Sequence, residues 1–357
     1  MTSPLLHALL GVRTVNLGEA DERARVAAFV RAHPDATPFH LPEWSIAVAR
    51  GCGQRAHMLV AESADGALVG ILPLTETHSP LFGRALVSAG FGVGGGILAQ
   101  TDGAVSSLSS AAWDLASKLR CPTLDLRGGP VAGSAWVADD TTYLGFARLL
   151  AADDEAELAA IPRKQRAEVR KALGSDLDLT IGSGPEEARA HYAVYAESVR
   201  NLGTPVFPRK LFTAVLEEFG DDADILTILS DGRPVASVLN LYFNSTVFPY
   251  WGGGTHAARA LRANDAMYFA LMSHARARGC KRFDFGRSKA GTGAAAFKKN
   301  WGFEPEPLVY YRRTAAGGAP RDINPLNPRY RLKVEAWKRL PLWAANRVGP
   351  MISRGLG

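Results

Sequence analysis

Hydrophobic and polar positions follow the same order of elements twice along the chain. Each copy begins with an Asp-Gly turn ahead of a β-rich run, at 65–66 and at 231–232. Each then reaches a glycine cluster, passes through a helical segment and closes in an apolar-Asp-apolar strand, CPTLDLRGG (121–129) or CKRFDFGRS (280–288). Because these features recur in one order, the pattern predicts two tandem α/β domains of similar fold.

The two copies predict a first domain over residues 1–150 and a second over residues 151–315. The segment AAAFKKNWGFEPEPLVYYRR (294–313) follows the second copy and has no counterpart in the first. It predicts a short helix, a stop at Gly302 and a hairpin. Chemistry encoded in this segment therefore belongs to the second domain, and residues 316–357 form a separate C-terminal arm.

The composition is that of an ordinary soluble protein, with 47% hydrophobic and 21% charged residues in 357. No apolar run approaches the roughly 18 residues of a membrane span, and no basic residue precedes the apolar patch at the N-terminus. Cys52, Cys121 and Cys280 lack the spacing of a metal site and fit buried thiols in a reducing compartment. We therefore expect a cytoplasmic protein with no metal and no tightly bound cofactor.

Positive charge is concentrated in the C-terminal arm. Residues 312–357 contain ten Lys or Arg against Asp322 and Glu335, a charge of +8, so that the net charge of +6 leaves −2 for the remainder. The arm interleaves these charges with apolar residues such as Trp337 and Trp343. Basic amphipathic segments with Trp bind the inner face of an anionic membrane, but an arm docked on the second domain has the same pattern, and both alternatives stay open. We expect no DNA partner.

Two glycine-rich stretches look like nucleotide loops and fail the spacing test. In GRSKAGTG (286–293), Gly286 and Gly291 have P-loop spacing, but the only nearby lysine, Lys289, comes too early. This stretch is interpreted as a turn that helps to build a cleft. GFGVGG (90–95) is followed by a strand and not by a helix, which indicates a close backbone approach. The chain has no HExxH, CxxC or GxSxG motif, and His256 and His274 are interpreted as isolated surface or core histidines.

A basic helix is predicted over IPRKQRAEVRKAL, beginning after Pro162. Its cations share roughly 160° of the helix surface at about 100° per residue; they are Arg163, Lys164, Arg166, Arg170 and Lys171, opposite Gln165, Val169, Ala172 and Leu173. One interpretation is a solvated face. The other is a grip on the phosphates of a substrate, for which Arg and Lys on one face are suited.

Lys298 is the strongest catalytic candidate. In a helix over 294–301 it shares one face with Ala294, Phe297 and Trp301, whereas Lys299 points the other way. A lysine on the apolar side of a helix is costly unless it has a partner or opens onto a site. We predict that it places positive charge where an oxyanion develops in acyl transfer. The alternative is a lysine whose stem only covers the aromatic residues.

Five further residues of the second domain are candidates. Asp284 is predicted to orient an acceptor amine or to take its proton through water, or else to tie down the following turn through Arg287 or Lys289. Tyr250 and Trp251, ahead of a glycine run, are predicted to line an acceptor cleft, with a place in the core as the alternative.

A family resemblance follows from these motifs. FKKNWGF ahead of a hairpin resembles the end of the GNAT acyltransferase fold, and two such folds with PRKQRAEVRKAL opening the second resemble the FemAB-like peptidyltransferases. The set FHLPEW, GILPL, LGTPVFP, FDFGRSK, FKKNWGF and NPLNPRYRL is most similar to FemAB-related proteins of exosortase/PEP-CTERM systems. The resemblance covers nearly the whole chain and implies an α/β (α+β) fold of two GNAT-like domains with mixed central sheets.

The resemblance also implies a reaction, which is transfer of an acyl or aminoacyl group onto an amine by direct attack. The donor is then aminoacyl-tRNA or acyl-CoA, and the acceptor is a phosphorylated or lipid-linked precursor of the cell envelope or an exopolysaccharide. The family's Phe-Lys pair falls on Phe297 and Lys298, and its phosphate contacts fall among Lys164, Arg166 and Arg170. YWGGGTHAARALRAND departs from the Q/R-x-x-G-x-G/A pyrophosphate loop of GNAT enzymes, which favours a donor other than CoA. The alternative is a non-catalytic GNAT-like adaptor that binds a glycan or lipid intermediate in an exosortase-linked export system.

Overall fold

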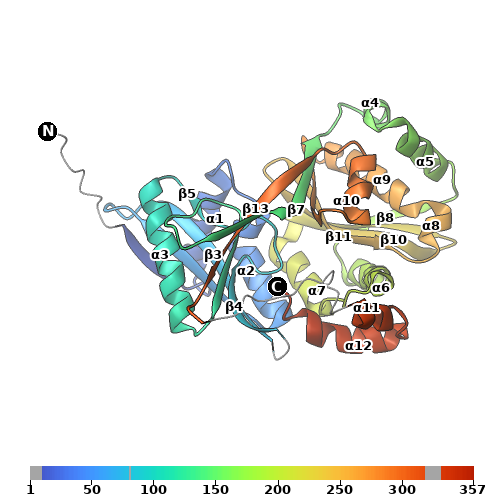
Figure 1. The fold of residues 1–357 in the computed structure, drawn as a ribbon. Helices are drawn as coiled ribbons and strands as arrows, with labels where there is room; N and C mark the ends of the chain where they lie inside the picture. The colour runs from blue at the N-terminus through green and yellow to red at the C-terminus, as the bar shows by residue number, and fades with distance from the viewer. Residues whose placement is uncertain (1–9, 80–81, 318–330) are drawn as a thin grey trace. The chain divides into compact units, whose positions relative to one another are not determined.

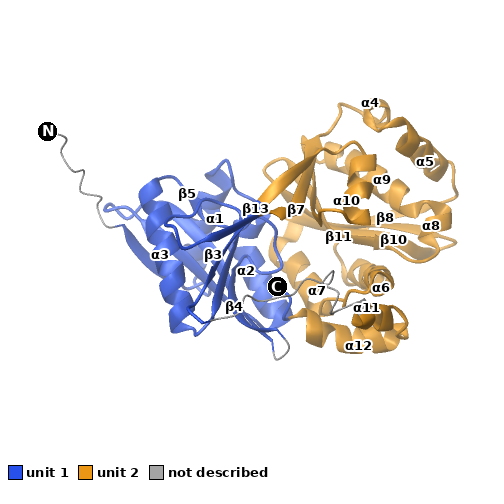
Figure 2. Cartoon of the chain, in the orientation of Figure 1, with its two compact units in different colours: residues 1–139, 309–323, 355–357 blue, residues 140–308, 324–354 orange. Residues whose placement is uncertain are grey.

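The structure is a computed structural model that describes residues 10–79, 82–317 and 331–357, and the chain divides into two compact units (Figure 2). Unit 1 consists of residues 1–139, 309–323 and 355–357, and unit 2 of residues 140–308 and 324–354. The predicted domain boundaries at 150 and 315 stay predictions. Residues 318–330 of the predicted arm lie outside the described residues.

Unit 1 is built on a mixed sheet with the strand order β1-β2-β3-β4-β6-β13. These strands are β1 (Gly11–Val15), β2 (Arg55–Glu62), β3 (Leu68–Ser79), β4 (Gly83–Ser88), β6 (Thr123–Arg127) and β13 (Pro305–Thr314), and β5 (Leu98–Ala99) pairs with β3. The helices are α1 (Ala20–Ala32), η1 (Pro38–His40), α2 (Pro42–Cys52) and α3 (Asp102–Lys118). β4 and β6 are parallel, whereas the other neighbours in this order are antiparallel.

In unit 2 the strands follow in the order β7-β12-β11-β10-β9-β8 and are again mixed in direction. Its strands are β7 (Val137–Leu149), β8 (Asp178–Gly182), β9 (Ala223–Ser230), β10 (Arg233–Phe243), β11 (Thr246–Gly254) and β12 (Arg282–Lys289). β11 and β12 are parallel, and the other neighbours are antiparallel. Each unit thus contains one parallel pair, which needs a helical crossover.

Helices cover both faces of the sheet in unit 2 (Figure 1). They are α4 (Asp154–Ala160), α5 (Arg163–Leu173), α6 (Pro185–Leu202), α7 (Arg209–Phe219), η2 (Gly220–Asp222), α8 (Ala258–Leu261), α9 (Ala263–Ala277), α10 (Gly293–Asn300), α11 (Arg331–Lys338) and α12 (Leu342–Ser353). α5, α9 and α10 lie on one face, and α6, α7, α11 and α12 lie on the other. The chain therefore reaches α10 on the α9 side directly after β12.

The repeated sequence pattern corresponds to a repeated crossover. In unit 1, α3 connects the parallel strands β4 and β6, and in unit 2, α8 and α9 connect β11 and β12. The prediction of two tandem α/β domains with mixed central sheets is confirmed. Among the described residues, no helix combines the length and the apolar character that crossing a membrane requires.

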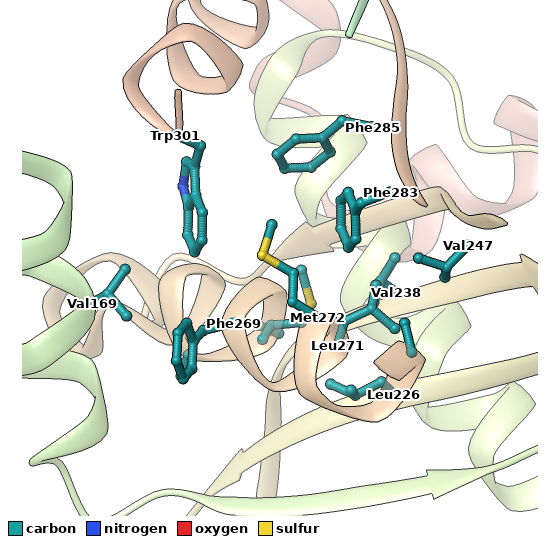
Figure 3. Close-up of a cluster of buried hydrophobic side chains, with 14 of the residues drawn as sticks. Val169, Leu226, Val238, Val247, Phe269, Leu271, Met272, Phe283, Phe285 and Trp301 are labelled. Atoms are coloured by element: carbon teal, nitrogen blue, oxygen red, sulfur yellow. The ribbon is translucent and has the colours of Figure 1, made fainter. Parts of the chain in front are cut away.

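The core of unit 2 lies between α9 and the sheet. In Figure 3, Met272 of α9 faces Phe283 and Phe285 of β12, and Trp301 closes the same cluster. Val169 of α5 also enters it, because the apolar side of that helix packs against α9. Burying this cluster contributes about 25 cal/mol for each Å² of apolar surface removed from water, which fixes α5 and α10 against α9.

The helix projection of α5 is correct except at its end. Gln165, Val169 and Ala172 are buried, as predicted, but Leu173 is 51% exposed. Leu173 is the last residue of α5, and the chain leaves the helical path at Gly174. A residue at a frayed helix end does not follow the face that the projection assigns to it.

The GFGVGG stretch forms a loop held tightly against β6. A Cβ atom at Gly96 would collide with the carbonyl oxygen of Gly128, and the buried Arg127 Nη1 donates to the carbonyl oxygen of Gly92 at 2.9 Å. The close backbone approach that the sequence indicates is therefore present, and no helix follows the loop directly.

Candidate active site

β12 carries a bulge at the place where it parts from β11. The parallel pairing of the two strands is limited to Thr246 with Arg282 and Val247 with Phe283. Pairing of β12 with β7 then shifts register between Asp284 and Arg287, and Gly286 has a φ of 68°. Backbone groups of the bulge are consequently free of the regular ladder and available to side chains.

The GRSKAGTG stretch is strand for its first half, which corrects its interpretation as a turn. β12 continues to Lys289, because the bulge restores pairing with β7 after Gly286. The turn itself is confined to 290–292, and Thr292 Oγ1 caps α10 by accepting from the backbone N–H of Ala295.

Lys298 of α10 is anchored on this bulge. Its Nζ donates to the carbonyl oxygen of Gly286 at 3.0 Å and to that of Arg287 at 3.0 Å, and the residue is 9% exposed. Phe146 and Phe285 flank the amine, with ring centroids 5.3 and 5.4 Å from Nζ. The predicted burial of a lysine among aromatic residues is confirmed, and its partners are backbone carbonyls.

Protonation of this lysine is finely balanced. Burial lowers the pKa of Lys298 to about 7, although the nearby Asp284 carboxylate opposes the shift. An ammonium has three N–H donors, whereas a neutral amine has two. The two carbonyls satisfy two donors in either state, so that only the ammonium retains a third N–H for another acceptor.

Asp284 fixes the bulge from the other side. Its Oδ1 accepts the backbone N–H of Gly286 at 2.8 Å. Burial raises the pKa of the Asp284 carboxyl group, against the effect of this hydrogen bond. The predicted tie to the following turn is thus made to the backbone, whereas Arg287 and Lys289 lie over the ring of Tyr143 at 4.7 and 5.7 Å.

The exposed face of α10 differs by one residue from the projection. Phe297 is half-buried, Lys298 and Trp301 are buried, and Lys299 is exposed, as expected. Ala294 is exposed, and Ala295 takes the buried place instead, because it lies three residues before Lys298 on the same side of the helix. The predicted site residues Phe297 and Lys298 therefore lie together on the core side of α10.

Tyr250 and Trp251 lie within β11, where Trp251 packs on the α6–α7 side. Trp251 is 5% exposed and packs edge-on against Phe212, with 4.9 Å between the ring centroids. The ring centroid of Phe207 lies 5.9 Å from that of Trp251. Tyr250 is half-buried and contacts Trp251 at 4.9 Å. Trp251 thus belongs largely to an aromatic core, and Tyr250 is the more accessible of the two.

The basic helix α5 packs beside the start of α9. Gln165 Nε2 donates to Asp265 Oδ1 at 2.6 Å, and Glu168 forms an ion pair with Arg262. Lys164 and Arg170 are exposed, whereas Arg166 is half-buried and its Nε has no hydrogen-bond partner among the described residues. The three predicted phosphate ligands therefore share one helix but differ in exposure.

The connection from β11 to α9 contains further unsatisfied polar atoms. Arg262 adopts the left-handed conformation with a φ of 54°, unusual for a residue with a side chain. Thr255 Oγ1 and Asn264 Oδ1 are buried without hydrogen-bond partners among the described residues. Strained backbone and unpaired polar groups of this kind cluster at ligand sites, and no motif in the sequence marks these three residues.

His274 is not isolated, which corrects its interpretation. Its Nε2 lies 2.9 Å from Asp224 Oδ2, and Asn240 Nδ2 and the Tyr242 hydroxyl donate to the same carboxylate at 2.9 Å. Arg278 completes the set at 3.5 Å. The cluster ties the end of α9 to β9 and β10, and its partners are 16 to 54 residues from Asp224 in sequence, too far for a local motif.

No group of three His, Cys, Asp or Glu side chains within the described ranges has the arrangement of a metal site. His256 is exposed, and its backbone N–H donates to Glu197 Oε1 at 2.8 Å. The three cysteines are buried and free.

Comparison with known proteins identifies the domain type. Residues 162–299 match the family model described as acetyltransferase (GNAT) domain. No curated protein matches the sequence.

Most of the chain has solved structural relatives. FemX matches with a TM-score of 0.65 and 14% identity, over 84% of this chain and 96% of FemX. A tandem GNAT protein from the clavulanic acid biosynthesis pathway matches with a TM-score of 0.54 and 14% identity, over 88% and 100%. The C-terminal domain of a putative lysylphosphatidylglycerol synthetase from Agrobacterium fabrum has a TM-score of 0.54 and 13% identity, over 84% and 93%. At these identities the likeness concerns the fold, and it confirms the predicted tandem GNAT architecture.

Proposed function

We propose that this FemAB-like tandem GNAT protein is an N-acyltransferase of Fem type, with its active site in unit 2 around Lys298. The observation that carries the proposal is the amine of Lys298, held by two carbonyls of the β12 bulge where β11 and β12 part. The GNAT domain match covers this region, from α5 to α10. The substrate is an acyl or aminoacyl ester or thioester, and the acceptor is an amine.

The reaction forms a C–N bond and breaks the C–O or C–S bond of the donor, whose alcohol or thiol leaves with a proton. The attacking amine loses one proton, and the carbonyl oxygen of the donor carries negative charge in the transition state. The ammonium of Lys298 has one N–H beyond those given to Gly286 and Arg287, and that N–H stabilises the oxyanion. Phe146 and Phe285 keep water from the amine and strengthen this interaction.

Asp284 serves the acceptor side of the reaction in this proposal. Its hydrogen bond to Gly286 N–H fixes the carbonyls that hold Lys298, so that it positions the lysine. It also orients the acceptor amine or accepts its proton through water. Phe297 lies on the same helix as Lys298, and with Arg287 and Lys289 on β12 it lines the substrate site in this proposal. Tyr250 on β11 lines the acceptor cleft, and the largely buried Trp251 supports Tyr250 from the core.

Both candidate donors carry phosphates, and α5 is the element suited to them. Lys164 and Arg170 are exposed on it, and the half-buried Arg166 presents a guanidinium with an unsatisfied Nε. GNAT domains use acyl-CoA, which makes acyl-CoA one donor to test; aminoacyl-tRNA is the other. The acceptor is a phosphorylated or lipid-linked precursor of the cell envelope or an exopolysaccharide, in keeping with a structural neighbour named as a putative lysylphosphatidylglycerol synthetase. The exosortase/PEP-CTERM setting rests on the sequence motifs.

One observation favours a second candidate function, a non-catalytic adaptor. The two carbonyl partners of Lys298 are sufficient to explain a buried lysine whose only role is to stabilise the β12 bulge. In this case unit 2 binds an envelope intermediate and transfers nothing.

A transfer assay separates the two functions. Purified full-length protein is incubated with labelled acetyl-CoA, longer acyl-CoAs or aminoacyl-tRNA and with UDP-linked or lipid-linked precursors bearing a free amine. Transfer that Lys298→Ala lowers at least 100-fold, while the exposed neighbour variant Lys299→Ala retains it, supports the enzyme. Binding of a precursor without transfer from any donor supports the adaptor.

A further inference from the structure

The C-terminal helix α12 has two chemically different faces. Ala345, Gly349 and Ser353 are buried, at intervals of four residues that place them on one side of the helix. Trp343, Val348 and Met351 are 73%, 42% and 66% exposed on other sides. Small residues thus face unit 2, and large apolar residues face solvent.

The inward face fixes the orientation of α12. Gly349 approaches Val206 so closely that an added Cβ would lie 3.1 Å from a Val206 methyl group. Ser353 Oγ donates to the carbonyl oxygen of Val206 at 2.8 Å. Since both contacts are specific and buried, the helix is docked on unit 2 at the α6–α7 connection, and the exposure of its outer face is a property of the docked state.

The outward face combines apolar and cationic side chains. At about 100° per residue, Trp343, Arg347 and Met351 fall within roughly 80° of one another. Val348 continues the apolar part of this surface, and Arg354 is also exposed. A tryptophan and a methionine beside arginines match an interfacial helix, which inserts apolar side chains at the level of lipid head groups.

α11 shows the same division. Its inner side contacts α6, where Val334 lies against Gly203 and the carbonyl oxygen of Lys338 accepts from Arg200 Nη1 at 3.1 Å. On the outer side, Leu332 is 84% exposed, and Arg339 is exposed at the end of the helix. Residues 331–357 contain six Lys or Arg and only Glu335 as an acid.

We propose that the outward faces of α11 and α12 form a membrane-binding surface for an anionic phospholipid bilayer. Trp343 and Met351 of α12 and Leu332 of α11 enter the interface, and Arg339 and Arg347 contact the lipid phosphates. Charge complementarity selects this occupant, because the segment has a net charge of +5 and its exposed apolar residues are interleaved with the cations. Docking on unit 2 and contact with a membrane, the two alternatives for the C-terminal arm, are then both satisfied, by opposite faces of the helices.

The same surface bears on the acceptor of the proposed reaction. The α6–α7 connection that α12 holds through Val206 continues with Phe207, whose ring lies 5.9 Å from that of Trp251 on β11. A bilayer against α12 thus lies next to the segment that contacts β11 through Phe207, which favours a lipid-linked acceptor over a freely diffusing one. This last step rests on the proposed function, whereas membrane binding does not.

Vesicle sedimentation tests the binding surface without any assay of activity. Full-length protein is mixed with vesicles of phosphatidylcholine alone or with about 30% phosphatidylglycerol. We expect binding only to the anionic vesicles and a steep decrease with salt. Trp343→Ser is expected to lower the partition constant about tenfold or more, and Arg339→Glu with Arg347→Glu at least 25-fold, since each basic residue contributes a factor of about five.

Matched controls separate the surface from general charge and hydrophobicity. Leu179→Ser and Arg233→Glu replace exposed residues on β8 and β10 and are expected to leave binding unchanged. Equal binding of all variants, or no binding of the unaltered protein to anionic vesicles, would overturn the proposal, and capture of an acidic protein in place of vesicles would do the same. If vesicle binding holds and no acyl transfer is found with any donor and acceptor of the transfer assay, the proposed function fails and the membrane surface stands.

Discussion

The Nζ atom of Lys298 lies 3.0 Å from the carbonyl oxygen of Gly286 and 3.0 Å from that of Arg287. Both carbonyls belong to a bulge that Asp284 holds through the N–H of Gly286. The position of the amine therefore depends on a local backbone conformation as well as on α10. Substitutions in the bulge and substitutions in α10 therefore test the position of the amine separately.

Gly286→Ala is expected to weaken acyl transfer more than it weakens the fold. No atom lies within 4 Å of a Cβ at Gly286, so that the cost comes from its φ of 68° and amounts to about 1 kcal/mol of unfolding free energy. Any shift of the bulge moves the carbonyls that hold Lys298, and we expect transfer to decrease at least tenfold. Urea unfolding and initial transfer rates measure the two effects.

Gly232→Ala is the matched control. Gly232 has a φ of 70° and equally open surroundings, but it lies in the turn between β9 and β10. A similar loss of stability with unchanged transfer is expected there. Equal loss of transfer in both variants would show that stability, and not the bulge, limits the activity.

Asp224→Ala is expected to reduce the unfolding free energy by about 3–5 kcal/mol, because the buried carboxylate accepts from Asn240 and Tyr242 and pairs with His274 and Arg278. Thermal or urea denaturation of the variant gives the value. Asp178→Ala, at an exposed position on β8, provides the comparison and is expected to change stability by less than about 0.5 kcal/mol. A small effect at Asp224 would mean that its four partners find other acceptors.

His191 is expected to make the protein acid-sensitive. It is fully buried, and burial lowers its pKa to about 3, whereas an exposed histidine in the unfolded chain has a pKa of about 6.5. Between these values the unfolded state binds the additional proton, so that stability decreases as the pH falls, by up to about 1.4 kcal/mol per pH unit. The free energy of unfolding at pH 6.5 and at pH 5 is therefore expected to differ by about 1.6 kcal/mol through this residue, as urea unfolding would measure.

His191→Gln removes that contribution while keeping a polar partner for Ser237, which lies 3.0 Å from Nδ1. The pH dependence of the variant is expected to be shallower by the same amount. His256→Gln, at an exposed site, is expected to leave it unchanged. An unaltered slope in the His191 variant would assign the acid sensitivity to other groups, such as the buried His40, whose pKa burial lowers to about 4.

Local patterns predicted the parts of this molecule that depend on neighbours in sequence. The Asp-Gly turns and the repeated crossover indicated tandem domains, and helical spacing put Lys298 on the buried side of α10. The bulge was not predictable, because it arises from the register between β12 and β7, about 140 residues apart. The motif FKKNWGF alone therefore could not predict that the carbonyl oxygens of Gly286 and Arg287 are the partners of Lys298.

The cluster at Asp224 was not predictable either, because its members are far apart in sequence. His274 has no neighbouring motif, and its partner comes from β9, which the sheet brings to the end of α9. Similarly, the arm's pattern fitted both docking and membrane contact, since only packing shows that Gly349 and Ser353 face Val206 and that Trp343 does not. The composition of a helix alone does not show which of its sides is buried.

The pH dependence of kcat/KM tests the role of Lys298 most directly, with the donor and acceptor that the transfer assay identifies. Since the pKa of Lys298 is lowered to about 7 and only the ammonium has a third N–H, we expect kcat/KM to decrease as the pH rises through about 7. Lys298→Arg stays charged at these pH values and is expected to lose that decrease, whereas Lys299→Arg retains it. A decrease that persists unchanged in Lys298→Arg would contradict the assignment of the oxyanion charge to Lys298.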